Sequence, residues 1–325
     1  MNRDVLNHIL DLDKLSVKKN EQGIILLNEK DIVSRSEMGC VDTYNLGEIP
    51  VYAKNADGHT AFGLLLSRIF NKLGYATPKT TLAKEETTGD IKSISQDVKN
   101  ICQGIDHSAV RACDLREYLA AEDKVKGLTK GSAMSEYWAA IYDRHIQELF
   151  LSFLDQGCID KLNERRIIGD LFTYTDPHHA NIFLHKGKGS DKQTDPIQID
   201  LERSGFVVTF SEDFDDFLDA LYYSCEPFGA AALNNYRERI LEIMELIQDG
   251  AFTPEQINLM KKIIACDITQ VINEVEGVVK AATKSQAKSF GLGLQKTTIE
   301  LQFNRTKEFL LRLLEYLNNT LGREL

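Results

Sequence analysis

The chain has 325 residues, of which 43% are hydrophobic and 27% are charged. This composition is typical of a globular protein large enough for two lobes, and it excludes a disordered or fibrous chain. The formal net charge of −11 argues against nucleic acid as a partner, because such binding usually needs a basic surface. The six cysteines are scattered without a C-x-x-C pair, so neither a disulfide framework nor a zinc site is indicated, and a reducing compartment is favoured.

The first residues lack a signal-peptide core, and no apolar run approaches the length of a transmembrane helix. We therefore expect a soluble, cytoplasmic protein; export into a host-cell cytosol through a carboxy-terminal signal stays open. Residues 1–21 form a predicted N-terminal helical extension. Within it, Val5 to Leu15 places apolar residues on one face, which predicts a short helix.

A strand-rich region follows, and we expect it to form a small lobe over residues 22–98. Glycines and polar residues separate short apolar runs, as in hairpins, at residues 24–27, 31–33, 40–41 and 49–53. Thr60 to Leu73 has apolar residues at helical spacing, with Gly74 just past its end, and predicts a helix. Two more strands are expected, over residues 80–84 and 91–98, before a linker near residues 96–100.

The pattern becomes helical from about Asn100, and we expect a large lobe over residues 99–204 with helices at 114–123 and 134–155. Residues 205–325 are predicted to form an all-helical C-terminal subdomain. Its expected helices lie near residues 211–221, 236–247, 254–278 and 297–317. A capping box with proline at the first helical position opens the third of them.

Polar residues stand at the ends of two short apolar strands of the large lobe. The hexapeptide from Asp176 to Asn181, of the form D-x-H-x-x-N, precedes the apolar run that begins at Ile182, and Asp200 ends the next one. Carboxylate and amide oxygens are ligands that Mg²⁺ takes beside nucleotide phosphates. The pattern predicts phosphoryl transfer, with Asp176 as the base for the attacking hydroxyl and with Asn181 and Asp200 as Mg²⁺ ligands.

These residues resemble the catalytic loop and the D-F-G segment of the protein-kinase superfamily. The form with His178 is similar to that of phosphoinositide kinases and of HipA-like bacterial kinases. The resemblance implies a two-lobed, kinase-like α+β fold that binds ATP and Mg²⁺. Val51 to Lys54 is similar to the superfamily's V-A-I-K strand, which implies that Lys54 holds the α- and β-phosphates. Ser36 and Gly39 lie in the hairpin where the superfamily has its glycine-rich loop, and the resemblance implies that they contact the nucleotide.

The sequence also departs from the superfamily pattern. Tyr174-Thr175 and Leu201-Glu202 replace the residues usual beside the two aspartates, and only one glycine of the glycine-rich loop is present. Lys54 could be an ordinary solvated strand end, and the loop an ordinary polar hairpin. Kinases place a glutamate in the first helix to pair with the strand lysine, but Thr60 to Leu73 contains no acidic residue. Asp57 or a more distant acid could substitute, or Lys54 lacks a partner until the lobe rearranges.

A basic stripe near the C-terminus has two interpretations. Its members recur at helical spacing or follow shortly after: Lys280, Lys284, Lys288, Lys296 and Arg305. The first interpretation is a solvated helix face, and the second is a site for a polyanion with several phosphates. Some secreted bacterial effector kinases, which this chain resembles, are switched on by inositol hexakisphosphate. That resemblance implies the same molecule as a candidate ligand and activator.

Three classes of function follow from the sequence. The first is an ATP- and Mg²⁺-dependent Ser/Thr protein kinase of the atypical, bacterial effector type. The second is a small-molecule or lipid kinase, or a kinase-fold nucleotidyltransferase. The third is a nucleotide-binding pseudokinase that serves as an interaction module. The presence of Asp176, Asn181 and Asp200 together favours an enzyme over the pseudokinase.

Overall fold

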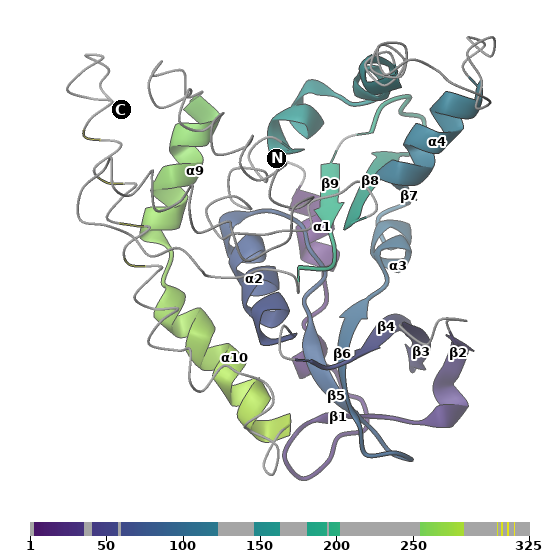
Figure 1. Ribbon diagram of the computed structural model, residues 1–325, viewed down its shortest axis with the longest axis vertical. Coiled ribbons are helices and arrows are strands. Elements are labelled where there is room, and N and C mark those ends of the chain that lie inside the picture. Colours follow the sequence, from purple (N-terminus) through teal and green to yellow (C-terminus); the bar gives the residue numbers. More distant parts are fainter. Residues whose placement is uncertain are drawn as a thin grey trace, which may run out of the picture.

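The computed structural model of the chain describes residues 3–35, 41–57, 60–122, 146–162, 181–193, 195–201 and 254–282, and also residues 304, 307, 311 and 315. Within these residues the architecture is α+β, with a larger and a smaller β-sheet and helices packed around both (Figure 1). The larger sheet dominates one lobe, and the smaller sheet with its flanking helices forms the other. The expected two-lobed α+β architecture is confirmed.

The larger sheet has six strands in the order β1-β5-β6-β4-β3-β2. These are β1 (Ile25–Leu27), β2 (Ile32–Arg35), β3 (Asp42–Leu46), β4 (Ile49–Asn55), β5 (Thr81–Glu85) and β6 (Ile91–Gln96). β1 runs parallel to β5, whereas the other neighbouring pairs are antiparallel. The expected hairpin between β1 and β2 is therefore wrong, because η2 (Glu29–Asp31) takes the chain from one edge of the sheet to the other.

The N-terminal segment covers one face of the larger sheet. Leu12 is fully buried in a core that includes Val51 and Ala53 of β4. The single helix expected over Val5 to Leu15 is wrong, because the chain instead forms α1 (Arg3–His8) and the 3₁₀ turn η1 (Leu12–Lys14). Between these elements, Leu10 N donates to Gln96 Oε1 over 3.0 Å, and this bond to β6 takes the place of helical pairing.

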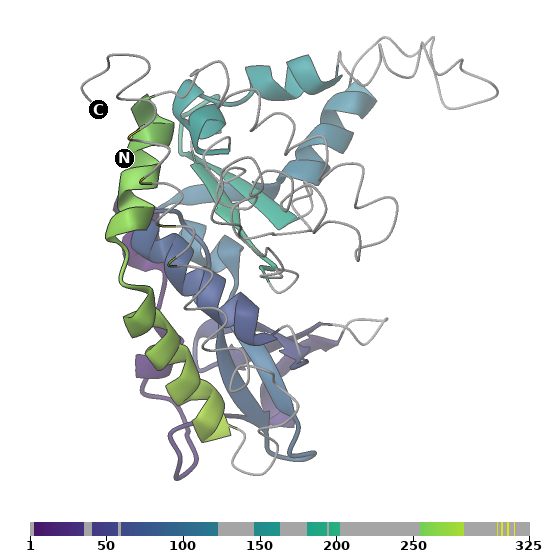
Figure 2. The same cartoon turned by 60° about the vertical axis from the view of Figure 1, so that its left-hand side comes forward.

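The helix α2 (Thr60–Leu73) has the predicted bounds, and Gly74 follows it in the left-handed conformation with φ +92°. It lies between the larger sheet and α10 (Ile268–Ala282), as both views show (Figures 1 and 2). Leu64, Leu65 and Leu66 are each 0% exposed. Consecutive side chains of a helix point about 100° apart, so these three leucines point in three different directions and all three are buried.

The C-terminal helices α9 (Pro254–Ala265) and α10 both pack against α2, and α10 also contacts β5. The sequence predicts one continuous helix here, but the chain breaks at Cys266 and Asp267. Asp267 then caps the new helix, since its Oδ1 accepts a hydrogen bond from Gln270 N at 3.1 Å. Because of this break, α9 and α10 run in different directions while both contact α2 (Figure 1).

The smaller sheet consists of β7 (His107–Arg111), β8 (Ile182–Gly187) and β9 (Asp195–Gln198), in that order and antiparallel throughout. Both sequence-predicted strands are present as β8 and β9. β7 lies where the sequence predicts only helices, and it is flanked by α3 (Val98–Gln103) and α4 (Ala112–Glu122). Residues 146–152 and 156–162 are also helical. None of the described helices is both long and apolar enough to cross a membrane.

A group of buried residues joins the two lobes. It comprises Val5 of α1, Ala76, three residues of α3 (Val98, Ile101 and Cys102), Phe183 of β8 and Ile197 of β9. Because Val5 lies in this group and Leu12 lies in the core of the larger sheet, the N-terminal segment contacts both lobes. Among the described cysteines, Cys102, Cys113, Cys158 and Cys266 are free thiols.

Candidate active site

Lys54 and Asp200 come from different lobes, because Lys54 lies on β4 of the larger sheet and Asp200 follows β9 of the smaller sheet. Lys54 Nζ lies 2.7 Å from Asp200 Oδ1. At this distance the ammonium and carboxylate form a charge-assisted hydrogen bond. Each side chain keeps 31% of its surface exposed, so the pair is accessible to a ligand. The structure thus brings together two of the residues that the sequence assigns to a nucleotide site.

β4 positions Lys54 to reach Asp200 of the other lobe. Its neighbour Ala53 is buried in the core on one face of the larger sheet. Side chains alternate along a strand, so Lys54 projects from the opposite face. Lys54 pairs in register with Ser93 of β6, an interior neighbour of β4. Lys54 therefore stands on a central strand that is held on both sides.

Asn181 immediately precedes β8 and is only 6% exposed. Its carbonyl oxygen accepts a hydrogen bond from Ile199 N at 2.9 Å. Since Ile199 is next to Asp200, this bond places the two predicted metal ligands at the same end of neighbouring strands. The structure thus brings the backbones of Asn181 and Asp200 close together.

Asp200 has an unusual backbone conformation, with φ +55° in the left-handed region. Aspartate tolerates this region better than most residues, but the conformation still costs about 1 kcal/mol or more and persists only where its surroundings impose it. The preceding residues are held from two sides, because Gln198 N donates to Ala76 O and Ile199 N donates to Asn181 O. The sequence contains no direct signal of this conformation.

The residues present fit a magnesium ion that is bound together with a nucleotide. Asn181 and Asp200 offer an amide and a carboxylate oxygen, and Mg²⁺ in nucleotide sites takes one or two protein ligands besides phosphate and water. Within the described ranges, no group of three or more His, Cys, Asp or Glu could hold a metal by itself. In a nucleotide site made of these residues, phosphate and water oxygens would complete the coordination.

The helix α2 supplies no carboxylate to Lys54, and Asp57, one sequence-predicted substitute, caps α2 instead. Thr60 N donates to Asp57 Oδ1 over 3.1 Å, and Asp57 N donates to Thr60 Oγ1 over 2.9 Å. The described acid at Lys54 is Asp200. A predicted metal ligand thus pairs with Lys54 where the resemblance to kinases implies a helix glutamate.

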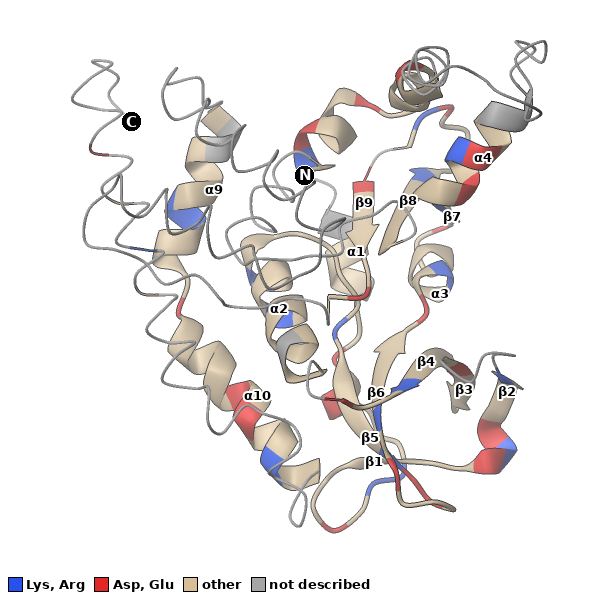
Figure 3. Cartoon of the chain, in the orientation of Figure 1, with Lys and Arg blue, Asp and Glu red and all other residues tan. Residues whose placement is uncertain are grey.

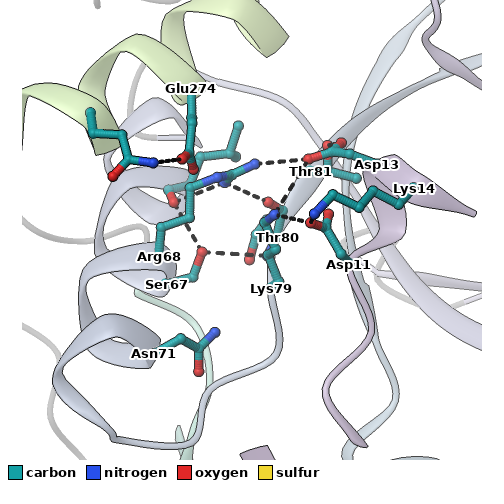
Figure 4. A network of polar contacts seen from close by, with 12 residues as sticks. Asp11, Asp13, Lys14, Ser67, Arg68, Asn71, Lys79, Thr80, Thr81 and Glu274 are labelled. Atoms are coloured by element: carbon teal, nitrogen blue, oxygen red, sulfur yellow. Dashed lines mark hydrogen bonds and ion pairs between the residues drawn. The ribbon is translucent and has the colours of Figure 1, made fainter. Parts of the chain in front are cut away.

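The charged residue that α2 buries is Arg68, which is 5% exposed. Its guanidinium donates to Leu64 O and Thr80 O and lies 3.1 Å from Asp13 Oδ2 (Figure 4). Burial lowers the pKa of Arg68, while the carboxylates of Asp13 and of Glu274 on α10 act in the opposite direction. This network connects α2 to the N-terminal segment and to α10.

Several predicted residues lie outside the described part of the chain. These are Asp176, Ser36 and Gly39 of the nucleotide site, and Lys284, Lys288, Lys296 and Arg305 of the basic stripe. Lys280 is described: it lies near the C-terminal end of α10, and its Nζ is 3.4 Å from Glu276 Oε2. α10 therefore carries charges of both signs, as Figure 3 shows.

No protein-family model matches the chain, and no curated protein matches it. Among solved structures, the chain is similar to CtkA, a proinflammatory kinase of Helicobacter pylori, with a TM-score of 0.41 and 11% identity over 86% of this chain and 90% of that one. It is also similar to LicA, a choline kinase from Streptococcus pneumoniae, with a TM-score of 0.24 and 10% identity over 87% of this chain and 94% of that one. At such low TM-scores and identities, neither likeness assigns an activity to this chain.

Proposed function

We propose that this protein is a phosphotransferase that uses ATP and Mg²⁺ to phosphorylate an alcohol group. The contact between Lys54 and Asp200 is the observation that supports it most strongly. A strand lysine and a carboxylate, distant in the sequence, meet beside Asn181 at an accessible junction between two lobes. A cation for phosphates next to oxygen ligands for Mg²⁺ is the arrangement that phosphoryl transfer requires.

In this proposal Lys54 binds the α- and β-phosphates, and Asn181 and Asp200 hold Mg²⁺. When bound, Mg²⁺ neutralises charge on the phosphate oxygens. Asp176 accepts the proton of the acceptor hydroxyl while the new bond from oxygen to the γ-phosphorus forms. The bond from that phosphorus to the bridging oxygen breaks, and ADP leaves with the electron pair. Ser36 and Gly39 cover the phosphates. The roles of Asp176, Ser36 and Gly39 rest on the sequence resemblance.

The direct pair between Lys54 and Asp200 has a consequence for ligand binding. Both groups are needed by the nucleotide and the metal, so the pair has to separate when Mg–ATP binds. Lys54 would then exchange the carboxylate for phosphate oxygens, and Asp200 would exchange the ammonium for the metal. Because the two exchanges occur together, nucleotide and metal should bind cooperatively at this site.

Single substitutions test the proposed roles. We expect Asp200→Ala and Asp176→Ala each to lower transfer at least 10²-fold, on the scale of groups that act by positioning and electrostatics. Lys54→Ala should weaken nucleotide binding. Transfer from γ-labelled ATP, measured with purified variants, checks the rates. Wild-type transfer by Asp200→Ala would show that the metal site is wrongly assigned.

The acceptor that we propose first is a serine or threonine of a protein, as in an atypical kinase of the bacterial effector type acting in a reducing host or bacterial cytosol. A small-molecule or lipid alcohol is the alternative acceptor, and nucleotidyl transfer is the alternative reaction. Parallel assays with α- and γ-labelled ATP separate the two reactions, because only nucleotidyl transfer retains the α-label on the product. A panel of proteins, lipids and small alcohols then separates the acceptors. Nucleotide binding without transfer to any acceptor would favour the pseudokinase.

We propose, as the second part of this hypothesis, that an inositol polyphosphate binds the basic stripe and activates the enzyme. The supporting observations are that the Lys280 side chain is 74% exposed and that α10, which carries it, packs against α2. Calorimetry with inositol hexakisphosphate on the wild type and on the Lys280→Ala, Lys284→Ala, Lys288→Ala triple variant tests binding. Transfer assays with and without the ligand test activation. If calorimetry shows no heat of binding and the ligand does not change the rate of transfer, the basic stripe is an ordinary solvated surface.

A further inference from the structure

The segment that follows α2 is hydrogen-bonded to Gln198, the last residue of β9, on the edge of β9 that does not pair with β8. Gln198 N donates to Ala76 O over 3.1 Å, and Thr77 Oγ1 donates to Gln198 O over 2.7 Å. Thr77 is 2% exposed and Gln198 is 4% exposed, so both bonds are shielded from water. Gln198 precedes Asp200 by two residues. The larger-sheet lobe thus holds the backbone that leads into the metal-binding carboxylate.

Thr77 is held in turn by α2. Asn71 Nδ2 donates to Thr77 O over 2.9 Å, and Thr77 N donates to Asn71 Oδ1 over 3.2 Å. These two bonds fix both backbone polar groups of Thr77 to the last turn of the helix. A continuous series of hydrogen bonds therefore runs from Asn71 on α2, through Thr77, to the backbone of Gln198.

We propose that Thr77 is a positioning residue that links the placement of α2 to the placement of Asp200. The proposal rests on the proposed function, because it gives Thr77 a role in metal binding. Asp200 keeps a left-handed backbone only while the residues before it are held in place. α2 has no carboxylate that could pair with Lys54 directly. The hydrogen bonds of Thr77 instead connect α2 to the backbone that leads to Asp200.

Two substitutions of Thr77 test the contribution of its hydroxyl to this role. Thr77→Val keeps the shape of the side chain and removes the donor to Gln198 O, whereas Thr77→Ser keeps the donor. We expect Thr77→Val to raise the Mg²⁺ concentration needed for half-maximal transfer about tenfold, a change within the range for loss of a buried hydrogen bond. Mn²⁺ binding in the presence of ATP, measured from the free-ion paramagnetic resonance signal, should weaken by a similar factor. Thr77→Ser should bring both values back to within about twofold of the wild type.

Thr81 provides a matched control. It is 1% exposed, and its hydroxyl donates to Asp13 Oδ1, away from Asp200. Thr81→Val is thus the same substitution at an equally buried threonine. It should lower the melting temperature and leave the dependence on Mg²⁺ and Mn²⁺ unchanged.

Three results would overturn the role of Thr77. They are wild-type metal dependence in Thr77→Val, an equal shift in Thr81→Val, and failure of Thr77→Ser to restore the wild-type values. Each of them leaves the proposed function standing, provided that the wild type binds Mg–ATP. A wild-type protein that binds neither Mg–ATP nor Mn–ATP would overturn the proposed function itself, and the role of Thr77 with it.

Discussion

Lys54 takes its carboxylate partner, Asp200, from the segment just past the end of β9 in the smaller sheet. Asp200 lies 2.7 Å from Lys54, and under the proposed function the same residue would also serve as a metal ligand. A kinase with a helix glutamate divides these tasks between two carboxylates. The shared carboxylate predicts that loss of Asp200 affects both lysine placement and metal binding, whereas loss of Lys54 leaves the metal ligands in place.

Tyr44 gives a pH-dependent test at the residue scale. It is fully buried in β3, and its hydroxyl donates to Glu85 Oε1 over 3.0 Å. Burial and the Glu85 carboxylate raise the pKa of Tyr44 above its ordinary value of 10.0. A raised folded-state pKa contributes stability that is fully present below about pH 10 and is lost as the pH rises beyond it.

We therefore expect the wild type to lose about 1.4 kcal/mol more stability than Tyr44→Phe for each pH unit above about 10. Urea denaturation followed by circular dichroism between pH 8 and pH 11 measures this difference. Lysines titrate in the same range, but both proteins contain the same lysines, so the comparison removes their effect. Parallel stability curves for the two proteins over this pH range would contradict the assignment.

At the scale of elements, α10 is a structural cover for α2. Ile272 of α10 is 0% exposed, whereas Thr269 on the same helix is exposed. Ile272→Ala should lower the free energy of unfolding by about 2–5 kcal/mol through lost burial and a residual cavity. Thr269→Ala should change it by no more than about 0.5 kcal/mol. Equal effects of the two substitutions in urea denaturation would show that α10 does not pack as described.

Some elements could be predicted from the sequence because their signals are local. α2 combines a strict apolar period with Gly74 at its end, and its bounds are confirmed. The pairing of β1 with β5 could not be predicted, because it depends on which distant strand offers an open edge. β7 was missed because it is a short edge strand without an alternating apolar pattern. The break before α10 was missed because the apolar period continues through Asp267.

The same reasoning applies to the candidate site. Residue type and spacing select Asn181 and Asp200, because the chemistry of Mg²⁺ restricts which side chains can serve, whereas Lys54 was selected by the resemblance to the kinase strand. The sequence left open whether Asp57, a more distant acid or no acid pairs with Lys54, since an ion pair between two lobes depends on their relative placement. The role of Thr77 also had no sequence signal, because its hydroxyl contacts a backbone carbonyl, which every residue possesses.

At the scale of the whole molecule, the N-terminal segment connects the two lobes. Val5, 1% exposed, packs in the group between the lobes that also contains the buried thiol of Cys102. Burial, with a smaller effect of Asp97, raises the pKa of Cys102 to about 12. At pH 8 this thiol should therefore be protonated, shielded and almost unreactive.

Val5→Asp places an unpaired charge in this group and should separate α1 from the lobe junction. We expect alkylation of Cys102 at pH 8, quantified by peptide mass spectrometry, to accelerate on the order of tenfold or more as local opening becomes easier. Cys158, which is also 0% exposed but lies in a different core cluster, serves as the internal control. Equal acceleration at both cysteines would indicate global unfolding and not release of α1.

The binding of ATP to wild type and Asp200→Asn, each with and without Mg²⁺, tests the central claim most directly. Because the proposed function makes Asp200 both the partner of Lys54 and a metal ligand, the substitution should have opposite effects in the two conditions. Calorimetry should show Mg–ATP binding weakened at least tenfold in Asp200→Asn, because a metal ligand is lost. Metal-free ATP should bind about fivefold more tightly, because Lys54 is released and a repelling charge is removed. Unchanged affinity in both conditions, or no ATP binding by the wild type, would contradict the assignment of this site.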